Sequence, residues 1–379
     1  MIKVLDIGYD RKTFEQGSAV EARMIEYGKL FEELHLIIFA KKSLGFKEKR
    51  IAPNVWVYPT NSISRWFYVF DAARLGKRIV FDKKFVRGES VITAQDPFET
   101  GLVGLKIKRK WRIPLHIQLH TDPFSPFFNG FINFLRKRIA HKVLKNTNAV
   151  RTVSDSLAKR VENEFSISKN KIKTLPIYVD RARIENAKVS FDLHARFGWH
   201  FILLAVSRLS EEKNLSMALE VLKKLLTFFP NTGLVIVGSG PEENKLKSLS
   251  KNLGLDSNVA FVGWQEDIGS YYKTANLFIQ TSNFEGYGLS LVEAGISGLP
   301  IVTTDVGIAK DLDNGKDAYI CPVGDSEYMF KAVYDLVENN SKRENLKLNI
   351  MKTLESKLLS KENYMQEYKD MLENASKLG

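Results

Sequence analysis

Short apolar runs alternate with longer amphipathic segments along most of the chain. The apolar runs, which predict strands, cover residues 2–8, 35–40, 55–59, 91–95, 200–209, 233–240 and 258–264. The amphipathic segments, which predict helices, cover residues 19–34, 65–80, 216–229 and 243–254. This alternation is typical of parallel sheets that are covered by helices. The pattern therefore predicts an α/β protein with doubly wound, Rossmann-like sheets, which bind ligands at the carboxyl ends of their strands.

The length of the chain favours two domains. A chain of 379 residues is longer than one hydrophobic core usually supports. The segment 178–198 lacks a clear period, so we expect one domain over residues 1–185 and another over 186–360. Residues 361–378 have the pattern of a further amphipathic helix.

Three features indicate a cytoplasmic protein. No apolar run reaches the roughly 20 residues of a membrane-spanning helix. The first residues, MIKVLDIGYD, have the pattern of a strand and a turn, and not that of a signal peptide. The one cysteine, Cys321, excludes an internal disulfide and suits a reducing compartment.

The stretch 281–300, TSNFEGYGLSLVEAGISGLP, carries the strongest chemical signal. It places Glu285 and Glu293 on either side of a glycine-rich turn, and the apolar pattern after the turn predicts a buried helix. Gly286 and Gly288 allow the backbone to approach a ligand closely or to adopt positive φ. The free N–H groups at the helix start favour an anion. Both carboxylates can therefore border one pocket while doing different jobs.

Together with residues 275–282 and 298–307, this stretch resembles the E-x7-E signature of retaining glycosyltransferases of the GT-B fold, family 4. The resemblance implies two Rossmann-like domains that face a central cleft, with the helix 361–379 crossing back to the first domain. It implies a nucleotide-sugar donor, with Glu293 on the ribose hydroxyls and Glu285 facing the transferred sugar. It also assigns contacts with sugar or phosphate to the turn residues Gly286, Tyr287, Gly288 and Leu289.

Two cations follow the strand predicted at 200–209. Arg208 and Lys213 lie on a strand-to-helix loop, from which a planar guanidinium and a compact ammonium can hold a diphosphate from two sides. The run VSRLSEEKN resembles the R-x4-K element of the family, whose two cations hold the phosphates of the donor.

Two further donor-side elements come from the resemblance. The turn GSGP that begins at Gly238 matches a strand-end glycine turn, which lets the nucleotide approach the backbone. The segment 261–279 matches the part that lines the base, with Gly263, Trp264 and Ile268 as candidates. For Trp264 and Ile268, packing within the domain is an equally good interpretation.

The first half supplies candidates around the acceptor. Gly17 precedes a predicted helix whose first N–H groups can face the donor phosphate or the acceptor, although an ordinary N-cap turn explains Gly17 nearly as well. The family often has two glycines here, where this chain has Gly17 and Ser18. His120 ends a predicted strand and resembles the family's active-site histidine beside the reacting sugar. Asp96 and Thr100 resemble acceptor contacts.

The resemblance implies transfer of a glycosyl group with retention of its anomeric configuration. Negative charge builds on the departing diphosphate, and Arg208, Lys213 and helix N–H groups would stabilise it. We find no acidic cluster that demands a divalent metal, so we expect neither a metal nor another cofactor. The residues expected to act in catalysis are His120, Arg208, Lys213 and Glu285. Our hypothesis for the chemical step is a same-face displacement, with the leaving diphosphate oxygen as the base.

The net charge of +12 is unevenly distributed. Residues 1–179 hold 33 Lys and Arg against 17 Asp and Glu, whereas the rest of the chain holds 23 against 27. The positive first half indicates an anionic surface or substrate on that side. Residues 123–145 predict a basic amphipathic helix with Ser125 as its N-cap, and 106–112 predict a basic loop. The apolar stripe of the helix is Phe124, Phe128, Phe131, Leu135, Ile139 and Val143.

Both basic segments, 123–145 and 106–112, can bind an anionic membrane surface. Alternatively, the stripe packs on the domain's own sheet and the charges are merely solvated. We expect peripheral binding to the inner face of the cell membrane, with a lipid-linked acceptor or a cell-surface glycan precursor.

Two other functions stay open at this point. A nucleotide-sugar epimerase of the same architecture would act on its substrate without an acceptor. A basic nucleic-acid-binding protein is disfavoured, because aromatic and basic residues interleave only at 106–145 and no nucleic-acid module is recognised, so no nucleic acid is expected as a partner. The sequence leaves open the choice of UDP or GDP, the sugar, the acceptor, the linkage and the oligomeric state.

Overall fold

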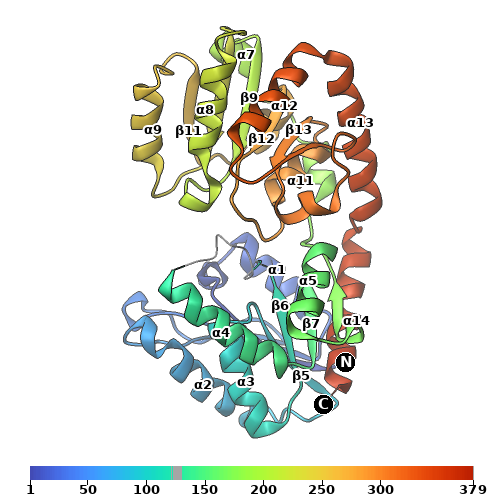
Figure 1. The fold of residues 1–379 in the computed structure, drawn as a ribbon. Coiled ribbons are helices and arrows are strands. Elements are labelled where there is room, and N and C mark those ends of the chain that lie inside the picture. Colours follow the sequence, from blue (N-terminus) through green and yellow to red (C-terminus); the bar gives the residue numbers. More distant parts are fainter. Residues whose placement is uncertain (121, 123–129, 379) are drawn as a thin grey trace. The chain divides into compact units, whose positions relative to one another are not determined.

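The computed structural model describes residues 1–120, 122 and 130–378. The chain divides into two compact units, shown in Figure 1. One unit consists of Met1–Pro176 with Leu359–Gly379, and the other of Ile177–Leu358. The C-terminal segment is therefore part of the same unit as the N-terminus.

The first unit ends earlier than the predicted boundary at residue 185. Helix α6 (Arg181–Glu185) packs on α11 (Leu289–Ile296). The ammonium of Lys273 donates to the backbone carbonyls of Glu185 and Ala187, at 2.7 and 2.6 Å. These contacts attach α6 to the second unit.

The first unit is built on an eight-stranded sheet. Its strands are β1 Lys3–Gly8, β2 Glu33–Ile38, β3 Lys49–Ala52, β4 Val55–Pro59, β5 Ser90–Ala94, β6 Leu115–Leu119, β7 Ala149–Thr152 and β8 Ile172–Thr174. Its α-helices are α1 Ala19–Gly28, α2 Tyr68–Asp82, α3 Glu99–Trp111, α4 Phe131–Lys145, α5 Asp155–Phe165 and α14 Lys361–Lys377. The strand order is β3-β4-β2-β1-β5-β6-β7-β8, and every neighbouring pair is parallel except β3 with β4.

The strand order places α1 and α3 on opposite faces of this sheet. From the centre, β1 leads to β2 on one side and β5 leads to β6 on the other. Right-handed crossovers in opposite directions put their helices on opposite faces. Helix α14 lies with α1, where the rings of Tyr27 and Tyr368 stack with their centroids 4.8 Å apart. The carboxyl ends of β1 and β5 therefore form a switch point in the strand order.

A buried arginine ties α14 to the sheet. Arg151 on β7 donates to the side-chain oxygen of Gln118 and to the hydroxyl of Tyr364, both at 3.0 Å, and to the carbonyl of Leu175 at 2.9 Å. Its guanidinium also lies over the rings of Tyr364 and Tyr368. Because a buried charge is costly without such partners, Arg151 fixes the position of α14 on this unit.

The second unit is built on a six-stranded sheet in which every neighbouring pair is parallel. Its strands are β9 Phe201–Val206, β10 Thr232–Val237, β11 Val259–Gly263, β12 Leu277–Gln280, β13 Ile301–Thr304 and β14 Tyr319–Cys321. Besides α6 and α11, its α-helices are α7 Leu193–Phe197, α8 Leu215–Leu225, α9 Glu243–Asn252, α10 Ile268–Thr274, α12 Ser326–Glu338 and α13 Asn340–Lys357. The order β11-β10-β9-β12-β13-β14 reverses between β9 and β12, which places a switch point there.

The prediction for residues 106–112 of the first unit is wrong, and part of the prediction for 123–145 lies outside the described residues. Residues 106–112, predicted as a loop, are the last turns of α3 and its C-cap, Arg112, which has a φ of 56°. The predicted helix start with Ser125 as N-cap lies outside the described residues, and α4 begins at Phe131. Among the described helices, none is both long enough and apolar enough to cross a membrane.

The apolar stripe predicted along 123–145 is divided between solvent and core. Phe131 and Leu135 are exposed, Ile139 is half-buried, and Val143 is buried. The earlier part of the stripe, with Phe124 and Phe128, lies outside the described residues. The second half of α4 therefore packs on its own unit, while the first half presents apolar side chains to solvent.

Candidate functional site

The donor-side candidates of the second unit gather at one edge of its sheet. Arg208 follows β9, Gly238 follows β10, and Gly263 ends β11. Glu285 follows β12, the neighbour of β9 at the switch point. Because the strands are parallel, these residues share the carboxyl edge, where doubly wound sheets bind ligands.

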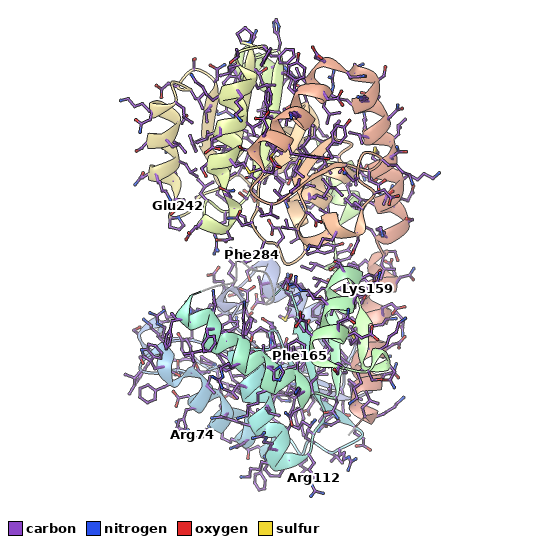
Figure 2. All side chains as sticks on the ribbon, viewed as in Figure 1. Arg74, Arg112, Lys159, Phe165, Glu242 and Phe284 are labelled. Atoms are coloured by element: carbon purple, nitrogen blue, oxygen red, sulfur yellow. The ribbon has the colours of Figure 1, made fainter. Side chains whose placement is uncertain are left out.

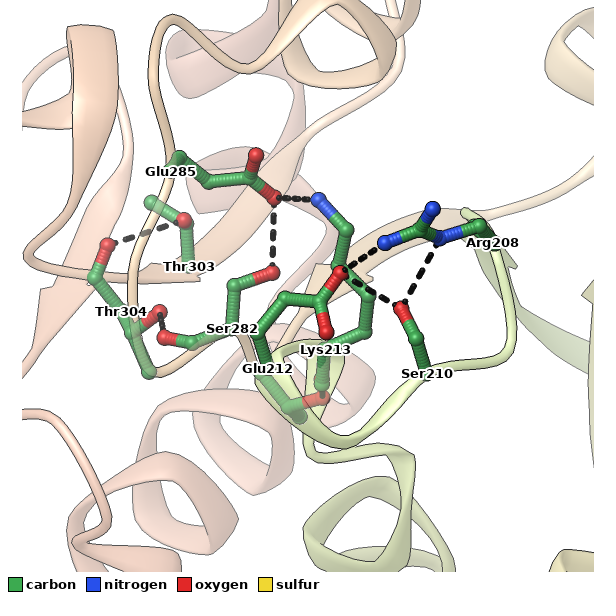
Figure 3. A network of polar contacts seen from close by, with 9 residues as sticks. Arg208, Ser210, Glu212, Lys213, Ser282, Glu285, Thr303 and Thr304 are labelled. Carbon is green, nitrogen blue, oxygen red and sulfur yellow. Dashed lines mark hydrogen bonds and ion pairs between the residues drawn. The ribbon is translucent and has the colours of Figure 1, made fainter. Parts of the chain in front are cut away.

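A salt bridge joins the loops after β9 and β12. The Nζ of Lys213 lies 2.7 Å from Oε1 of Glu285 (Figure 3). The hydroxyl of Ser282 donates to the same carboxylate oxygen at 2.8 Å. The side chains of Lys213 and Glu285 are only 18% and 11% exposed, so water screens this pair less than a surface pair. Two residues that the sequence assigned to different elements are thus in direct contact.

Arg208 forms a second ion pair beside the first. Its guanidinium donates to Oε1 of Glu212 at 2.8 Å and to the hydroxyl of Ser210 at 3.3 Å. Ser210 in turn donates to Glu212 at 2.6 Å. Burial raises the pKa of Glu212, but hydrogen bonds from Ser210 and Arg208 outweigh burial and lower that pKa. The ionised Glu212 thereby holds the exposed Arg208 on the loop that also carries Lys213.

The sequence interpretation missed the three polar partners in this network, Ser210, Glu212 and Ser282. The sequence did contain a signal for these partners, because Glu212 directly precedes Lys213 and Ser282 lies three residues before Glu285. Polar residues so close in sequence to functional candidates are placed to orient them by short hydrogen bonds.

Glu293 lies in a separate network. The hydroxyl of Tyr272 donates to its Oε2 at 3.0 Å. Burial raises the pKa of Glu293, opposed by that hydrogen bond and by the charge of Arg183. Across the described part of the chain, no hydrogen bond or ion pair joins Glu293 directly to Arg208 or Lys213. Its carboxylate therefore keeps acceptor capacity for a ligand hydroxyl.

The two glycines at strand ends, Gly238 and Gly263, are required for different structural reasons. A Cβ on Gly238, whose φ is 131°, would lie 1.9 Å from the carbonyl oxygen of Ser207. A Cβ on Gly263, whose φ is 72°, would meet nothing within 4 Å. Gly238 is therefore required by the packing of two turns of the protein itself, and Gly263 by its backbone conformation.

The turn before α11 is tightly held. Gly288 caps the helix with a φ of 97°, and the carbonyl of Tyr287 accepts from the amide of Ile308 at 2.7 Å. Tyr287 is buried, and Gly286 is half-buried. The predicted buried start of the helix is wrong at Leu289, which is exposed because the first residue of α11 points away from the core that begins at Leu291.

The candidates for the base differ in exposure. The side chain of Trp264 follows β11 and is 72% exposed, so packing within the unit does not explain it. Ile268 is half-buried at the start of α10. An exposed indole beside a ligand-binding edge offers a flat apolar surface to an incoming ring.

In the first unit, the candidates also follow the carboxyl ends of strands. His120 comes directly after β6 and is half-buried. Burial, followed by the charges of Arg151 and Arg23, lowers the pKa of His120 to about 3. Its imidazole is therefore neutral at physiological pH and can donate one hydrogen bond and accept another.

Two candidates of the first unit are engaged by the protein itself. The amide of Gly17 donates to Oε2 of Glu21 at 2.7 Å. Thr100 is fully buried, and its hydroxyl donates to the carbonyl of Asp96 at 3.2 Å and accepts from the amide of Asp96 at 3.1 Å. Thr100 therefore supports the loop of Asp96, and its side chain is not exposed to a ligand. Burial raises the pKa of the half-buried Asp96.

Two family models match the two units in turn. Residues 33–183 match Glycosyltransferase Family 4, and residues 193–353 match Glycosyl transferases group 1. The chain belongs to the group 1 glycosyltransferases of the GT-B fold. The predicted family and fold are thus confirmed, and nothing in the comparisons supports an epimerase or a nucleic-acid-binding protein.

Relatives of this glycosyltransferase carry several names. It is 24% identical over 269 residues to alpha-monoglucosyldiacylglycerol synthase of Acholeplasma laidlawii, an alignment that covers 65% of each chain. It therefore spans just under two thirds of that relative. It is 24% identical over 336 residues to N-acetyl-alpha-D-glucosaminyl L-malate synthase of Bacillus anthracis, which covers 85% of each chain. The crystal structure of Anabaena HepE in complex with UDP has the same fold, with a TM-score of 0.76, 19% identity, and coverage of 98% of this chain and 100% of that chain.

The edge of the second sheet gives this glycosyltransferase two cations that are already paired. Arg208 and Lys213 are each neutralised by a carboxylate, Glu212 and Glu285. Among the described residues, no group of three or more His, Cys, Asp and Glu side chains is arranged to hold a metal ion.

Proposed function

We propose that this chain transfers a sugar from a UDP- or GDP-linked donor to an acceptor, with retention of the anomeric configuration. The observation that carries the proposal is the Lys213–Glu285 salt bridge at the switch point, with Arg208 on the same loop. The UDP complex of HepE, a protein of the same fold, supports a nucleotide as part of the donor. Glu293 would then accept from the ribose hydroxyls, and Trp264 would lie against the base.

The two cations would stabilise the leaving group. Charge grows on the diphosphate as its bond to the sugar breaks, and preorganised cations favour that state. Arg208 is exposed enough to exchange Glu212 for a phosphate oxygen, whereas the less exposed Lys213 is held in place by Glu285. Because these cations and the first N–H groups of α11 can balance the charge of the diphosphate, we propose that the reaction needs no metal ion and no other cofactor.

The chemical step would take place on one face of the sugar. The acceptor oxygen forms a bond to the anomeric carbon as the bond from that carbon to the diphosphate oxygen breaks. The proton of the acceptor hydroxyl passes to the departing diphosphate oxygen. His120, which is neutral at physiological pH, would hydrogen-bond to the sugar, and Asp96 would face the acceptor.

A panel of UDP- and GDP-sugars tests this function by slow hydrolysis of the donor. We expect one donor to release its sugar, and Lys213→Gln to lower that rate about 100-fold or more. Lys224, which pairs with Glu327 on the exposed surface, is the control, and Lys224→Gln should leave the rate unchanged. A chelator should also leave the rate unchanged. The proposal fails if no donor is bound or hydrolysed.

Exposed apolar side chains in the first unit support an acceptor at a membrane. On α4 they are Phe131, Ile132, Phe134 and Leu135, and in the segment after β4 they are Ile63, Trp66, Phe67 and Phe70. Because α4 follows β6 and this segment follows β4, both groups start from the carboxyl edge of one sheet. Residues 106–112 end at the amino edge and so are left out of this surface.

We infer that this apolar surface and the cations of α4 bind the inner face of the cell membrane, where a lipid-linked acceptor would lie. The Acholeplasma relative, which is named alpha-monoglucosyldiacylglycerol synthase, supports a lipid acceptor. Each cation near an anionic surface contributes about 1 kcal/mol. Flotation with anionic vesicles should recover the wild type, and Trp66→Ser with Phe70→Ser should abolish recovery. Phe228→Ser, at an exposed site of the second unit, is the control, and equal recovery of all three proteins would remove the inference.

A further inference from the structure

A basic pocket lies at the amino edge of the first sheet, at the opposite ends of the strands from His120 and Asp96. It has a volume of about 330 Å³. Its lining includes four cationic residues, Arg87, Lys108, Arg109 and Arg112. Two neutral polar residues, Asn146 and Asn148, also line it. These residues come from the loop before β5, the end of α3 and the segment between α4 and β7. Arg112 is labelled in Figure 2 at the end of α3.

Among the described residues, no carboxylate balances the positive charge of this pocket. None of its lining residues is acidic, and in the described part of the chain none of the four cations has a carboxylate within 4.0 Å. Lys108 donates to the carbonyl of Asn146 at 2.7 Å and to the side-chain oxygen of Asn148 at 2.5 Å. Burial and the charge of Lys171 lower the pKa of Lys108. Four cations around one cavity repel one another unless an anion lies between them.

The position of α3 explains only part of this arrangement. Cations in the last turn of a helix interact favourably with its free carbonyl groups. That accounts for Lys108 and Arg109, and equally for Lys110, which does not line the pocket. It does not account for Arg87, which reaches the pocket from a different loop, or for Arg112, which follows the helix.

We propose that this pocket binds the phosphate group of an anionic ligand at a site separate from the donor site. Three guanidinium groups supply planar donor pairs that match phosphate oxygens, and Asn146 supplies a neutral polar rim. The volume is at the lower end of the about 300–1,000 Å³ that is usual for small-molecule sites. Leu105 forms an apolar wall, which suits the organic part of a phosphorylated compound.

The strands separate this pocket from the apolar surface of the same unit. The pocket lies where β5 and β6 begin, and the exposed side chains after β4 and on α4 start where the strands end. A five-residue strand such as β5 spans about 16 Å. A membrane bound at the carboxyl edge would therefore leave the pocket facing the solution, which favours a soluble phosphorylated compound over a lipid headgroup.

Calorimetric titration of the full chain with inorganic pyrophosphate tests the site. The variant Arg87→Gln/Arg112→Gln removes two cations from the lining, and Arg109→Gln is a second, independent variant. The control Lys106→Gln/Lys110→Gln removes two exposed charges of α3 that do not line the pocket. Arg208→Ala removes a cation from the donor site. A parallel flotation with phosphatidic acid vesicles distinguishes a lipid headgroup from a soluble ligand.

We expect the wild type, the Lys106/Lys110 control and Arg208→Ala to bind pyrophosphate equally at this site. The Arg87/Arg112 variant should bind at least tenfold more weakly, and Arg109→Gln several-fold more weakly, while donor hydrolysis stays at the wild-type rate. Binding only to phosphatidic acid vesicles, lost in the same variants, would assign a lipid headgroup. No binding of either probe, or binding that the Arg87/Arg112 and Arg109 variants retain, would overturn the proposal.

Discussion

The ammonium of Lys213 and the carboxylate of Glu285 lie 2.7 Å apart, with little of either side chain exposed. The pair of Lys224 and Glu327 has the same distance, but its side chains are 43% and 55% exposed. Equal geometry in different surroundings makes the second pair a matched reference for the first. Surface pairs contribute little to stability, whereas breaking a shielded pair leaves an uncompensated charge.

Lys213→Gln should therefore affect both stability and activity. The lone Glu285 would lower the free energy of unfolding by about 1–3 kcal/mol. Lys224→Gln should change it by less than about 1 kcal/mol. Urea unfolding followed by circular dichroism measures both values. Equal losses in the two variants would show that the Lys213 pair behaves as an ordinary surface contact.

The double variant Lys213→Gln/Glu285→Gln separates the two roles of the pair. Two neutral side chains leave no unpaired charge, so stability should recover by about 1 kcal/mol or more relative to Lys213→Gln. Donor hydrolysis should not recover, because neither the cation for the diphosphate nor the carboxylate for the sugar is present. Recovery of hydrolysis together with stability would mean that the pair is only structural.

Tyr272→Phe should weaken donor binding more than turnover. The hydroxyl of Tyr272 orients Glu293, and without it the carboxylate is less well placed for the ribose hydroxyls. We expect KM for the nucleotide sugar to rise about three- to tenfold with a small change in kcat, the value of one hydrogen bond. Glu293→Ala should shift KM in the same direction, whereas Glu285→Ala should mainly lower kcat. Steady-state kinetics with one donor measure both constants. If the two glutamate variants were indistinguishable from wild type, the roles given to Glu293 and Glu285 would be wrong.

The sequence was most informative where local pattern determines structure. The alternation of apolar runs predicted two sheets of mainly parallel strands, and the apolar pattern after the glycine-rich turn predicted the helix that the structure begins at Leu289. Parallel strands then bring Arg208 and Glu285 to one edge, because β9 and β12 are neighbours at the switch point. These relations follow from periodicity and topology alone.

What the sequence did not reveal depends on side-chain partners brought together by the fold. Thr100 was expected near the acceptor, but it is buried under the loop of Asp96. Gly238 was expected to admit a nucleotide, yet the nearby carbonyl of Ser207 already requires a glycine there. The four cations of the basic pocket come from two segments, Arg87 before β5 and residues 108–112 at the end of α3, which no local spacing could connect.

Gly238→Ala should destabilise the second unit much more than Gly254→Ala. Both glycines have positive φ, but a Cβ on Gly238 meets the carbonyl of Ser207, whereas a Cβ on Gly254 meets nothing within 4 Å. We expect a loss of at least about 2 kcal/mol for Gly238→Ala and about 1 kcal/mol for Gly254→Ala. Thermal unfolding of both variants measures the difference. Similar losses would show that backbone conformation alone decides the cost.

Asp6→Asn should stabilise the protein at high pH. Asp6 lies on β1, and burial raises its pKa to about 7, against a hydrogen bond from Gln95, the amide of Ile7 and the charge of Arg23. In the unfolded chain its pKa is about 3.9. Between these two values the folded state holds the extra proton, so raising the pH through this window lowers the stability by about 1.4 kcal/mol per pH unit from this group. Asparagine is neutral throughout and avoids that loss.

The melting temperature of Asp6→Asn should therefore exceed that of the wild type at pH 8, with a smaller difference at pH 5. Asp256→Asn, at an exposed position, should follow the wild type at both pH values, and a pH-independent effect of Asp6→Asn would contradict the raised pKa.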